Sequence, residues 1–589
     1  MIGTGVWAGL VLATAIPFLL AHCAPPGGAP GGEAAPRAFF PFDWPFRGMK
    51  QPAVMAPNGM VVSSSGLASD VGVEMMRRGG NAVDAAVATA FALAVTYPEA
   101  GNLGGGGFLV VRLASGETAS LDFREKAPLL ATRDMFIGAD GRVTDDAVTG
   151  HRASGVPGSV AGLHAAWRRY GRLSWEDVLA PAIRLAEGGF FVDERLHRTL
   201  AERQGRLTRF ASTVEVFFSN GAPPAVGSLF RQPALAETLR LLARNGPDAF
   251  YRGRIADWIV QEMQRGGGWI THQDLALYEA KWRDPIVSNY RGHTVIGMPP
   301  PSSGGVTLAE ILNLLEGYDL GRLGWHSPEA LHLFVEVFRR AYADRNYYLG
   351  DPDFVEMPIE RLTSDAYATD LRATISRNRA SSSDDFNRVP RVNEGNHTTH
   401  LSVVDAEGNA ASLTTTINSL YGSGVVVRGG GFFLNNEMDD FSARPGAPNQ
   451  FGLVQGEANA IEPGKRMLSA MTPVIVTAPD GRLLLVAGTR GGSTIITQMA
   501  QVVSHVVDYG MDLRTAVDAP RIHHQLFPDQ TYYERGGLDP VTRSALVAMG
   551  HTLTPADGYY GEVQAIGVRP DGTRVGVADE RMVGEAVGY

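Results

Sequence analysis

The run Asn396-His397-Thr398-Thr399-His400-Leu401-Ser402-Val403-Val404-Asp405, about two-thirds of the way along the chain, is the stretch on which the interpretation of the fold depends. Its Thr-Thr-His triplet leads directly into an alternating apolar segment, Leu401 to Val404. A turn at residues 406–409 and a second, threonine-rich segment, Ala411 to Ile417, follow at once. Because β-branched residues favour strands, the pattern predicts a β-hairpin whose first strand begins beside Thr398.

Thr398 has the chemistry of an activated nucleophile only under one condition. A threonine hydroxyl needs a base beside it, and the α-amine of the same residue can be that base once the chain is cut in front of it. Such an amine titrates at roughly pKa 7.7–8.0, which suits a general base near neutral pH. The sequence therefore raises the hypothesis that the bond between His397 and Thr398 is broken. Taken alone, however, the stretch favours an ordinary hairpin.

The rest of the chain changes this balance, because eight motifs, the Thr-Thr-His block included, resemble those of one family and occur in its order. The family is that of the γ-glutamyltransferases (glutathione hydrolases), and the resemblance extends from about Ala56 to Tyr589. Any one motif is weak, but eight in order are hard to reach by chance. The other seven are Gly79 to Ala86 (GGNAVDAA), Gly101 to Phe108 (GNLGGGGF), Leu121 to Glu125 (LDFRE), Gly155 to Ser159 (GVPGS), Pro300 to Gly305 (PPSSGG), Leu434 to Phe441 (LNNEMDDF) and Gly491 to Ser493 (GGS).

The resemblance implies a fold and a processing event. The expected fold is of the α+β class, a four-layer αββα sandwich of the N-terminal nucleophile (Ntn) hydrolases. The hydroxyl of Thr398 is expected to attack the carbonyl of His397 and cut the precursor there. Residues 52–397 then form a large subunit and residues 398–589 a small catalytic subunit, and the two build the sandwich jointly as a heterodimer.

The resemblance also assigns the residues of the site. Thr398 is the expected nucleophile, with Thr416 beside it, and the backbone amides of Gly491 and Gly492 form the oxyanion hole. A glycine pair entering a helix suits that role, because helix N-termini present free N–H groups. The donor-binding residues implied are an arginine for the α-carboxylate, two acids for the α-ammonium, a serine for the carboxylate and an asparagine that contacts both ends: Arg124, Glu437 and Asp440, Ser469, and Asn418.

The expected reaction is acyl transfer. Thr398 takes the γ-glutamyl group from glutathione or another γ-glutamyl compound as an ester, and water, an amino acid or a dipeptide accepts it. No cofactor and no metal are expected. The net charge of −10, without a long basic run, argues against nucleic acid as a partner.

Two departures from the family pattern concern the donor pocket. The family commonly has two serines before the methionine of Leu468-Ser469-Ala470-Met471, and here the second is Ala470. The loss of one neutral hydrogen bond costs roughly 0.5–1.5 kcal/mol. A gating aromatic residue, tyrosine in some relatives, is Phe451. The tyrosine hydroxyl that would help close the site is therefore missing, and Ala470 leaves open an acylase of the same fold, of the glutaryl or cephalosporin type. A silent binding protein is a further alternative, against which an intact Thr398 and Arg124 count.

The N-terminal residues have the composition of an export signal. An apolar run from Gly5 to Ala21 contains Pro17 and precedes a Pro/Gly-rich segment, and a run this short indicates a signal rather than a membrane span. We assign residues 1–24 to the signal and 25–51 to a linker. The single cysteine, Cys23, resembles a lipoprotein acylation site, although His22 fits poorly. The protein is thus expected to be periplasmic or lipid-anchored to a bacterial envelope.

Periodicity and turn residues predict the main elements, with strands concentrated after Thr398 and helices dominating from Gly158 to about Leu315. This segregation favours layered α+β packing. The expected helices are Ser65 (cap) to Arg78, Asn81–Val95, Ser159–Tyr170, Leu235–Asn245, Pro328–Tyr347, Ser493–Tyr509 and Pro540–Met549. The expected strand pairs are His400–Val404 with Ala411–Ile417, Met471–Ala478 with Leu483–Gly488, and Val563–Val568 with Arg574–Ala578.

Three other motifs are set aside. Gly104 to Gly107 lacks the Lys-Ser/Thr of a phosphate-binding loop and is interpreted as a close-packed backbone turn. The histidine pairs His397/His400 and His523/His524 lack the helical pattern of a zinc site. No Gly-x-Ser-x-Gly motif supports a serine-triad hydrolase.

Overall fold

The computed structural model describes residues 40–48, 51–386, 398–443 and 456–589, all within a compact unit that spans Arg37–Tyr589. The expected export signal, Cys23, His397 and Phe451 lie outside the described residues, as does most of the expected linker.

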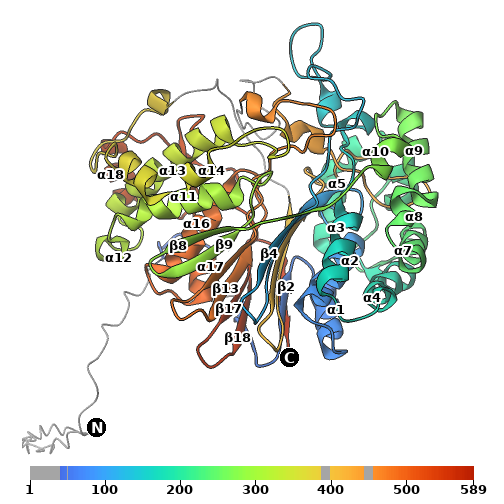
Figure 1. The fold of residues 1–589 in the computed structure, drawn as a ribbon, viewed down its shortest axis with the longest axis horizontal. Helices are drawn as coiled ribbons and strands as arrows, with labels where there is room; N and C mark the ends of the chain where they lie inside the picture. The colour runs from blue at the N-terminus through green and yellow to red at the C-terminus, as the bar shows by residue number, and fades with distance from the viewer. Residues whose placement is uncertain (1–39, 49–50, 387–397, 444–455) are drawn as a thin grey trace, which may run out of the picture. The chain divides into compact units, whose positions relative to one another are not determined.

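Two seven-stranded antiparallel sheets form the centre of the unit (Figure 1). The first has the order β1 (Val54–Ala56), β18 (Arg574–Ala578), β17 (Gln564–Val568), β13 (Leu483–Gly488), β12 (Val474–Thr477), β9 (His293–Gly297) and β8 (Ile286–Tyr290). The second has the order β19 (Glu585–Gly588), β2 (Met60–Ser63), β10 (Thr399–Val404), β11 (Ala410–Thr416), β3 (Gly106–Arg112), β4 (Thr118–Asp122) and β7 (Lys281–Arg283). Each sheet therefore contains strands from both sides of Thr398.

Helices cover the outer face of each sheet, which gives four layers (Figure 1). On the side of the β10 sheet lie α1 (Gly66–Arg77), α2 (Ala82–Thr96), α3 (Ser159–Tyr170), α4 (Trp175–Gly188), α5 (Glu194–Leu207), α6 (Ala211–Phe217), α7 (Pro233–Asn245), α8 (Asp248–Tyr251), α9 (Arg254–Gly266) and α10 (His272–Ala276), of which α1, α2 and α3 contact the sheet and α7 packs on α4. Against the sheet of β13 lie α11 (Gly304–Glu316), α12 (Leu320–Leu323), α13 (Pro328–Tyr348), α15 (Asp365–Arg372), α16 (Thr494–Val507), α17 (Leu513–Asp518) and α18 (Pro540–Ala548). The predicted αββα sandwich is confirmed.

The two sheets pack face to face through apolar side chains and hydroxyl groups. Val404 and Phe108 of one sheet share a buried cluster with Val486 and Ile566 of the other. The hydroxyl of Ser402 donates to the carbonyl oxygen of Gln564 in the opposite sheet at 2.9 Å. Because helices cover one face of β10 and a sheet covers the other, every residue of this strand is buried.

Most predicted elements are present with small shifts at their ends. The hairpin β10–β11 has the expected strands, and Asn81 caps the fully buried helix α2 with bonds from the amides of Val83 and Asp84. Ser65 stands at the N-cap of α1, but its side chain makes no capping bond, which corrects the expectation. Strand β12 starts at Val474 rather than Met471, because the residues before it line a pocket.

In the described part of the chain strands are denser after Thr398, as predicted, but they are not confined to that segment. Strands β2 and β3 precede Thr398 and flank the β10–β11 hairpin, β4 lies next to β3, and β8–β9 interrupts the segment assigned to helices. The turn at Gly104–Gly107 is close-packed as predicted, since a Cβ on Gly105 would lie 2.0 Å from the carbonyl oxygen of Thr416.

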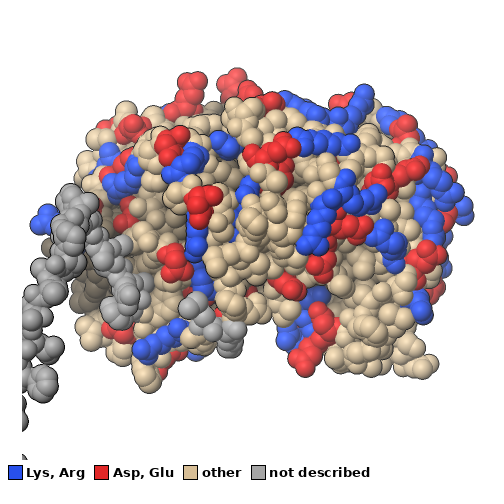
Figure 2. Space-filling view, turned by 90° about the horizontal axis from the view of Figure 1, so that it is seen from below, with Lys and Arg blue, Asp and Glu red and all other residues tan. Residues whose placement is uncertain are grey.

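Two further features of the described part concern its helices and its surface charge. None of its helices combines the length and the apolar composition needed to cross a membrane. Figure 2 views the unit from below, and there basic and acidic side chains are interspersed over the visible face.

Candidate active site

A single pocket brings together residues from distant parts of the chain. Its free volume is about 30 Å³, so side chains fill most of it. The lining consists of Arg124, Arg345, Thr398, Thr416, Asn418, Glu437, Asp440, Leu468, Ser469, Ala470, Met471, Gly492, Ser493 and Ile495. All the expected catalytic and donor-binding residues are in this set except Gly491, which directly precedes Gly492.

Thr398 and Thr416 are placed by the register of the central hairpin. Strands β10 and β11 pair antiparallel, with Thr399 opposite Thr415. One step further in the same register sets Thr416 opposite Thr398, and both side chains line the pocket. The hydroxyl of Thr416 accepts a hydrogen bond of 2.8 Å from the amide of Asn418, which leaves its proton available to a neighbour.

Asn418 follows the hairpin in a left-handed conformation, with φ of 70°. Its side-chain amide donates to the carbonyl oxygen of Asn436 at 3.0 Å. The amide of Asn436 in turn donates to Ile417 at 3.2 Å. These bonds fix the loop after β11 to the segment that carries η4 (Glu437–Asp440), so both acids expected to bind the donor are held beside the hairpin.

Gly491 and Gly492 form the turn between β13 and α16. Their φ angles are 141° and 55°, a conformation that favours glycine because a Cβ would be strained there. The carbonyl oxygens of Gly491 and Gly492 accept the first two helical amides, Thr494 at 3.1 Å and Ile495 at 3.2 Å. The turn therefore sits at a helix N-terminus, where N–H groups and the helix dipole favour negative charge.

Arg124 is the centre of a buried charge cluster, here called the Arg124 cluster: Arg124, Glu125, Glu437 and Asp440. Its guanidinium donates to one oxygen of Glu437 and one of Asp440, and it lies 3.5 Å from Glu125. The expected assignment gave Arg124 to the donor's carboxylate and the two acids to its ammonium. In the structure Arg124 and the two acids pair with one another.

The carboxyl groups of this cluster are strongly perturbed. Burial raises the pKa of Glu437 well above its usual range, and it also raises the pKa of Asp440, although Arg124 opposes both shifts. Burial raises the pKa of Glu125 to about 7. Neither oxygen of Glu125, nor Oε2 of Glu437, accepts a hydrogen bond from an N–H or O–H donor among the described residues. The cluster thus holds more carboxyl groups than it has donors to satisfy.

Ser469 and Ala470 form the wall next to Arg124. The hydroxyl of Ser469 accepts from the amide of Met471 at 3.1 Å, and its own proton remains available to a donor carboxylate. Ala470 is 8% exposed and joins the apolar cluster around α13 and α16. The position that carries a second serine in the family pattern therefore offers only a methyl group.

Arg345 is the pocket residue that sequence reasoning missed. It lies near the end of α13, is 1% exposed, and donates to the hydroxyl of Ser303 at 2.9 Å. Burial raises the pKa of Asp440, and the charge of Arg345 opposes that rise together with Arg124. The available signal was a run of charged residues in a helix that is otherwise apolar, Arg339 to Arg345.

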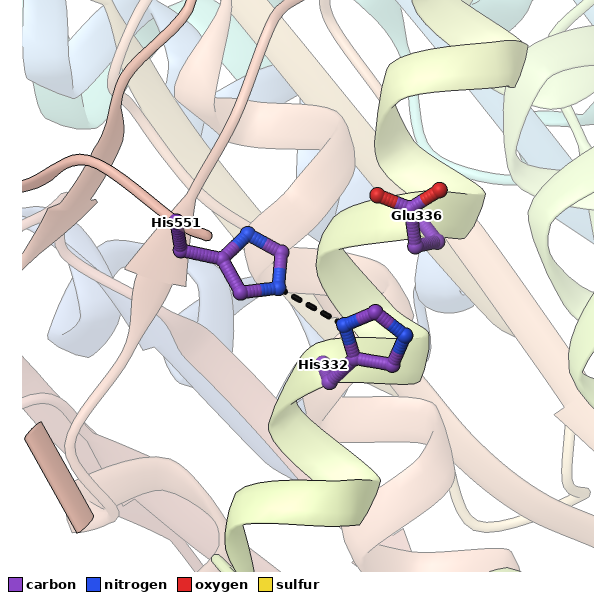
Figure 3. Close-up of side chains that lie close together, drawn as sticks. All are labelled: His332, Glu336 and His551. Atoms are coloured by element: carbon purple, nitrogen blue, oxygen red, sulfur yellow. Dashed lines mark hydrogen bonds between the residues drawn. The ribbon is translucent and has the colours of Figure 1, made fainter. Parts of the chain in front are cut away.

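A second polar group deserves comparison with a metal site. His332 and Glu336, one turn apart on α13, face His551 (Figure 3), and their ligand atoms lie within 4.8 Å of one another. His332 Nε2 donates to the carbonyl oxygen of Ser376 at 2.7 Å, so Nδ1 accepts from His551 Nε2 at 2.7 Å.

Glu336 of this group is already bonded to cationic and neutral donors. Arg340 donates to it at 2.8 Å and Arg339 lies 3.5 Å away. Hydrogen bonds from Ser381 and these two charges outweigh burial and lower the pKa of Glu336 to about 2. A cation would compete with two arginines, so the group is better explained as a contact between α13 and the chain after α18.

Comparisons with known proteins bear on this site. The family model described as Gamma-glutamyltranspeptidase matches residues 68–589. The chain belongs to this family. The glutathione hydrolase proenzyme of Escherichia coli (strain K12) is one of its relatives. The two sequences are 46% identical over 540 residues, which cover 91% of this chain and 93% of that protein.

Acylases are also similar to this γ-glutamyltranspeptidase-family chain. The acylase ACY 1 proenzyme of Pseudomonas sp. (strain SE83) is 37% identical over 551 residues, 91% of this chain and 94% of that protein. The crystal structure of cephalosporin acylase from Bacillus halodurans superposes with a TM-score of 0.81 at 29% identity, covering 94% of this chain and 99% of that one.

Proposed function

We propose that the protein is a self-processing γ-glutamyltransferase and glutathione hydrolase whose nucleophile is Thr398. The observation that carries the proposal is the Arg124 cluster in the same pocket as Thr398. The glutathione hydrolase proenzymes among its relatives support the same activity.

The Arg124 cluster suits the head group of a γ-glutamyl donor. That head group carries an α-carboxylate and an α-ammonium, and the cluster offers a buried arginine and buried carboxylates. When the donor enters, its carboxylate replaces Glu437 or Asp440 on Arg124, and its ammonium pairs with the released acid. The charge of the site is unchanged, so neither partner is left buried without a counter-ion, which would be costly.

The reaction then proceeds at the other end of the pocket. The α-amine of Thr398 takes the proton of the Thr398 hydroxyl as the oxygen attacks the γ-carbonyl carbon. The amides of Gly491 and Gly492 stabilise the oxyanion, and preorganised donors of this kind are each worth about 10²–10³ in rate. The amine passes its proton to the leaving nitrogen, which gives the γ-glutamyl ester.

The ester is resolved by the reverse proton transfers. The α-amine of Thr398 deprotonates water, or the amino group of an amino acid or dipeptide, as that nucleophile attacks the ester carbonyl. The C–O bond to Thr398 breaks and its oxygen recovers the proton. Hydrolysis releases glutamate, and transfer releases a new γ-glutamyl amide.

Self-processing uses the same hydroxyl. In the precursor, the hydroxyl of Thr398 attacks the carbonyl carbon of His397, and the C–N bond to Thr398 breaks, which frees the α-amine and leaves an ester. Water then hydrolyses this ester and releases the carboxylate of His397 and the hydroxyl of Thr398. Residues 52–397 and 398–589 then remain together as large and small subunits. The proenzyme names of the relatives support a processed enzyme.

An acylase of the same fold is the second candidate, favoured by Ala470 and by the similarity to acylases. A glutaryl donor has no α-ammonium to pair with Glu437 or Asp440. Because both acids line the pocket, the γ-glutamyl activity is the better supported of the two.

The proposed location is outside the cytoplasm of a bacterium, either in the periplasm or attached to the envelope through Cys23. The apolar run before Cys23 supports export. Growth in labelled palmitate and mass spectrometry of the N-terminal peptide test the attachment, and an unmodified peptide that lacks Cys23 contradicts it.

The deciding experiment compares kcat/KM for a γ-glutamyl anilide and for its glutaryl counterpart, which lacks only the ammonium. We expect a preference of at least about 10-fold for the γ-glutamyl compound, since a hydrogen bond to a charged group contributes roughly 1.5–3 kcal/mol. Equal or reversed preference would replace this proposal with the acylase.

Processing is tested separately by intact mass spectrometry. The purified protein should give two chains, the smaller beginning at Thr398, and Thr398→Ala should remain a single inactive chain. Thr415→Ala, on the paired strand β11, is a matched control, since Thr415 is absent from the pocket lining. An active protein in one uncut chain contradicts the cleavage.

A further inference from the structure

Arg490 is a buried cation directly before the glycine turn, and it does not line the donor pocket. Its Nη1 donates to the hydroxyl oxygen of Tyr97 at 2.8 Å and lies 3.8 Å from Glu562 Oε2. The hydroxyl of Tyr97 donates to that same oxygen of Glu562 at 3.4 Å. The three residues are all at most 5% exposed, so their mutual contacts are formed away from water.

A second ion pair supports Tyr97 from the other side. The guanidinium of Arg195 lies 4.3 Å above the centre of the Tyr97 ring and pairs with Glu99. The five buried residues Tyr97, Glu99, Arg195, Arg490 and Glu562 are here called the Arg490 cluster. With two arginines and two glutamates it is balanced in charge when both acids are ionised.

The Arg490 cluster is connected to both halves of the catalytic machinery. The amide of Glu562 donates to the hydroxyl of Thr489 at 3.0 Å, which fixes the residue before Arg490. A hydrogen bond from Ser64 also reaches Glu562. The hydroxyl of Ser64 lies 2.9 Å from that of Thr399, the neighbour of the nucleophile.

The backbone at Arg490 is clamped by the first turns of α16. The carbonyl oxygen of Arg490 accepts from Gln498 Nε2 at 3.3 Å, and Gln498 also donates to Thr494 at 2.7 Å. Thr494 donates through its hydroxyl to the carbonyl oxygen of Gly491 at 2.7 Å. Side chains of α16 thus fix the carbonyl groups of Arg490 and Gly491, while the other members of the Arg490 cluster fix the side chain of Arg490.

We infer that Arg490 is a positioning residue, held by Tyr97 and Glu562 so that the amides of Gly491 and Gly492 keep the orientation that an oxyanion requires. The inference deepens the proposed function and rests on it, because the oxyanion role of the two glycines belongs to that proposal. A misplacement of about 1 Å at a catalytic group can cost on the order of 100-fold in rate, so one side chain that fixes the turn has a large effect on kcat.

The state of Glu562 gives this role a pH dependence. Burial raises its pKa to about 7, against the lowering effects of Arg490, Arg195 and Ser64, while Glu99 raises it further. Tyr97 and Gln564 also face the carboxyl group. Above pH 7 the ionised carboxylate anchors Arg490, and below pH 7 the protonated form loses that charge.

The first test measures kcat and KM on a γ-glutamyl anilide for Arg490→Gln, per mole of cut chain as determined by intact mass. We expect kcat to fall by about 10–100-fold, with KM within about 3-fold, because the donor pocket is intact. Arg514→Gln is the matched control. Arg514 is equally buried, at 4% exposed against 5%, and pairs with Asp518 on α17, so it should lower Tm without changing kcat.

The second test uses Glu562→Gln and Tyr97→Phe, which keep the shape of the side chains if Arg490→Gln does not fold. The ratio of kcat of the unmodified protein to that of Glu562→Gln should be at least about 5 at pH 8.5 and approach 1 at pH 6, because at low pH both carry a neutral group. The ratio cancels the titration of the Thr398 amine. Tyr97→Phe should also lower kcat relative to the unmodified protein.

Each outcome decides the inference. An unchanged kcat in Arg490→Gln, or in both other variants, overturns it, as does a loss confined to KM or a pH-independent ratio. An unmodified protein without γ-glutamyl activity contradicts the proposed function instead, so the two failures are distinct.

Discussion

Two groups of arginines and carboxylates begin at the end of β4, and they differ in how fully the carboxylates are bonded. Asp122 belongs to the first, which we call the Arg466 cluster: Arg283 and Arg466 with Asp122, Asp351 and Asp353. Arg124, two residues later, is the centre of the Arg124 cluster. The same strand end therefore supplies one group to the framework and one to the pocket.

In the Arg466 cluster every carboxylate oxygen has a donor. Asp122 accepts from the amide of Arg124 and from Arg283 Nε, both at 2.9 Å. Asp351 accepts from the amides of Arg466 at 2.7 Å and Asp353 at 3.0 Å. Asp353 accepts from Arg283 through both oxygens, at 3.4 and 2.9 Å. In the Arg124 cluster three oxygens, two of Glu125 and one of Glu437, have no such donor. The balance of donors, and not the residue types, separates a structural group from a binding group.

The largest expected effects are those of replacing Arg124 and Arg466, the central arginines of the two clusters. Arg124→Gln should lower kcat/KM for a γ-glutamyl anilide by on the order of 10²–10³-fold, from the roughly 2–5 kcal/mol lost when a buried charge pair loses one member. Its Tm should change little, since the carboxyl groups left behind have raised pKa values and can take up protons.

Arg466→Gln should have the opposite profile and lower the stability by about 3–5 kcal/mol, seen as a lower apparent Tm in differential scanning fluorimetry. Arg133→Gln, at an exposed pair with Glu457, is the control for both. Equal losses of stability in Arg124→Gln and Arg466→Gln would remove the distinction between the clusters.

The next effect concerns the acids. Asp440→Asn should reduce the preference for the γ-glutamyl over the glutaryl anilide by about 10-fold or more, since a hydrogen bond to a charged group is worth roughly 1.5–3 kcal/mol. Asp353→Asn, in the Arg466 cluster, should lower Tm and leave the preference as it is. The comparison breaks down if Asp353→Asn alters the preference.

The two clusters should also respond to pH in opposite windows. Burial raises the pKa of Glu125 to about 7, so its contribution to stability is present below its ordinary pKa and is lost as pH rises through 7. Arg283 and Lys281 outweigh burial and hold the pKa of Asp353 well below its usual value. Its contribution is therefore present above the ordinary pKa of an aspartate and is lost on acidification.

Apparent Tm measured from pH 3 to pH 9 checks this. Glu125→Gln should weaken the decline between pH 6 and 8, though only in part, because burial also raises the pKa of Glu562 and Asp518 to about 7. Asp353→Asn should weaken the decline below pH 4. A Glu125→Gln profile parallel to that of the unmodified protein would contradict the assignment.

The smallest expected effect concerns Ala470 in the wall of the pocket. Ala470→Ser restores a hydroxyl beside Ser469 and should raise kcat/KM for the γ-glutamyl anilide by about 2–10-fold, the equivalent of one neutral hydrogen bond at roughly 0.5–1.5 kcal/mol. Steady-state kinetics measure it, with Ala458→Ser, outside the pocket lining, as control. A decrease would mean that the methyl group is needed for the shape of the pocket.

The elements predicted well are those whose signals are local. The β10–β11 hairpin and α2 were predicted because alternation, turn residues and the cap at Asn81 all lie within the segment itself. The hairpin β8–β9 was missed because its turn places Arg291 at φ of 52° before Gly292 at 81°. An arginine gives no signal for a left-handed turn, for which asparagine or glycine is usual.

Long-range pairing was the other limit. Strand β3 pairs with β11 some 300 residues later in sequence, and no local pattern indicates such a partner. The same holds for the site, since Arg124 and Glu437 are 313 positions apart. They could be named together only through resemblance to a family, and Arg345, which no quoted motif contained, was left out.

The interleaving of the sheets has a consequence for the history of the molecule. Strands β10 and β11 lie between β2 and β3, so the segments on the two sides of Thr398 alternate within one sheet. The intact chain can assemble this arrangement as a unimolecular process. Once cut, the same arrangement could re-form only by the meeting of two separate chains, neither of which has a complete sheet. After cleavage, folding would thus no longer be a reversible unimolecular process. Thermal unfolding of the mature enzyme would be irreversible on cooling.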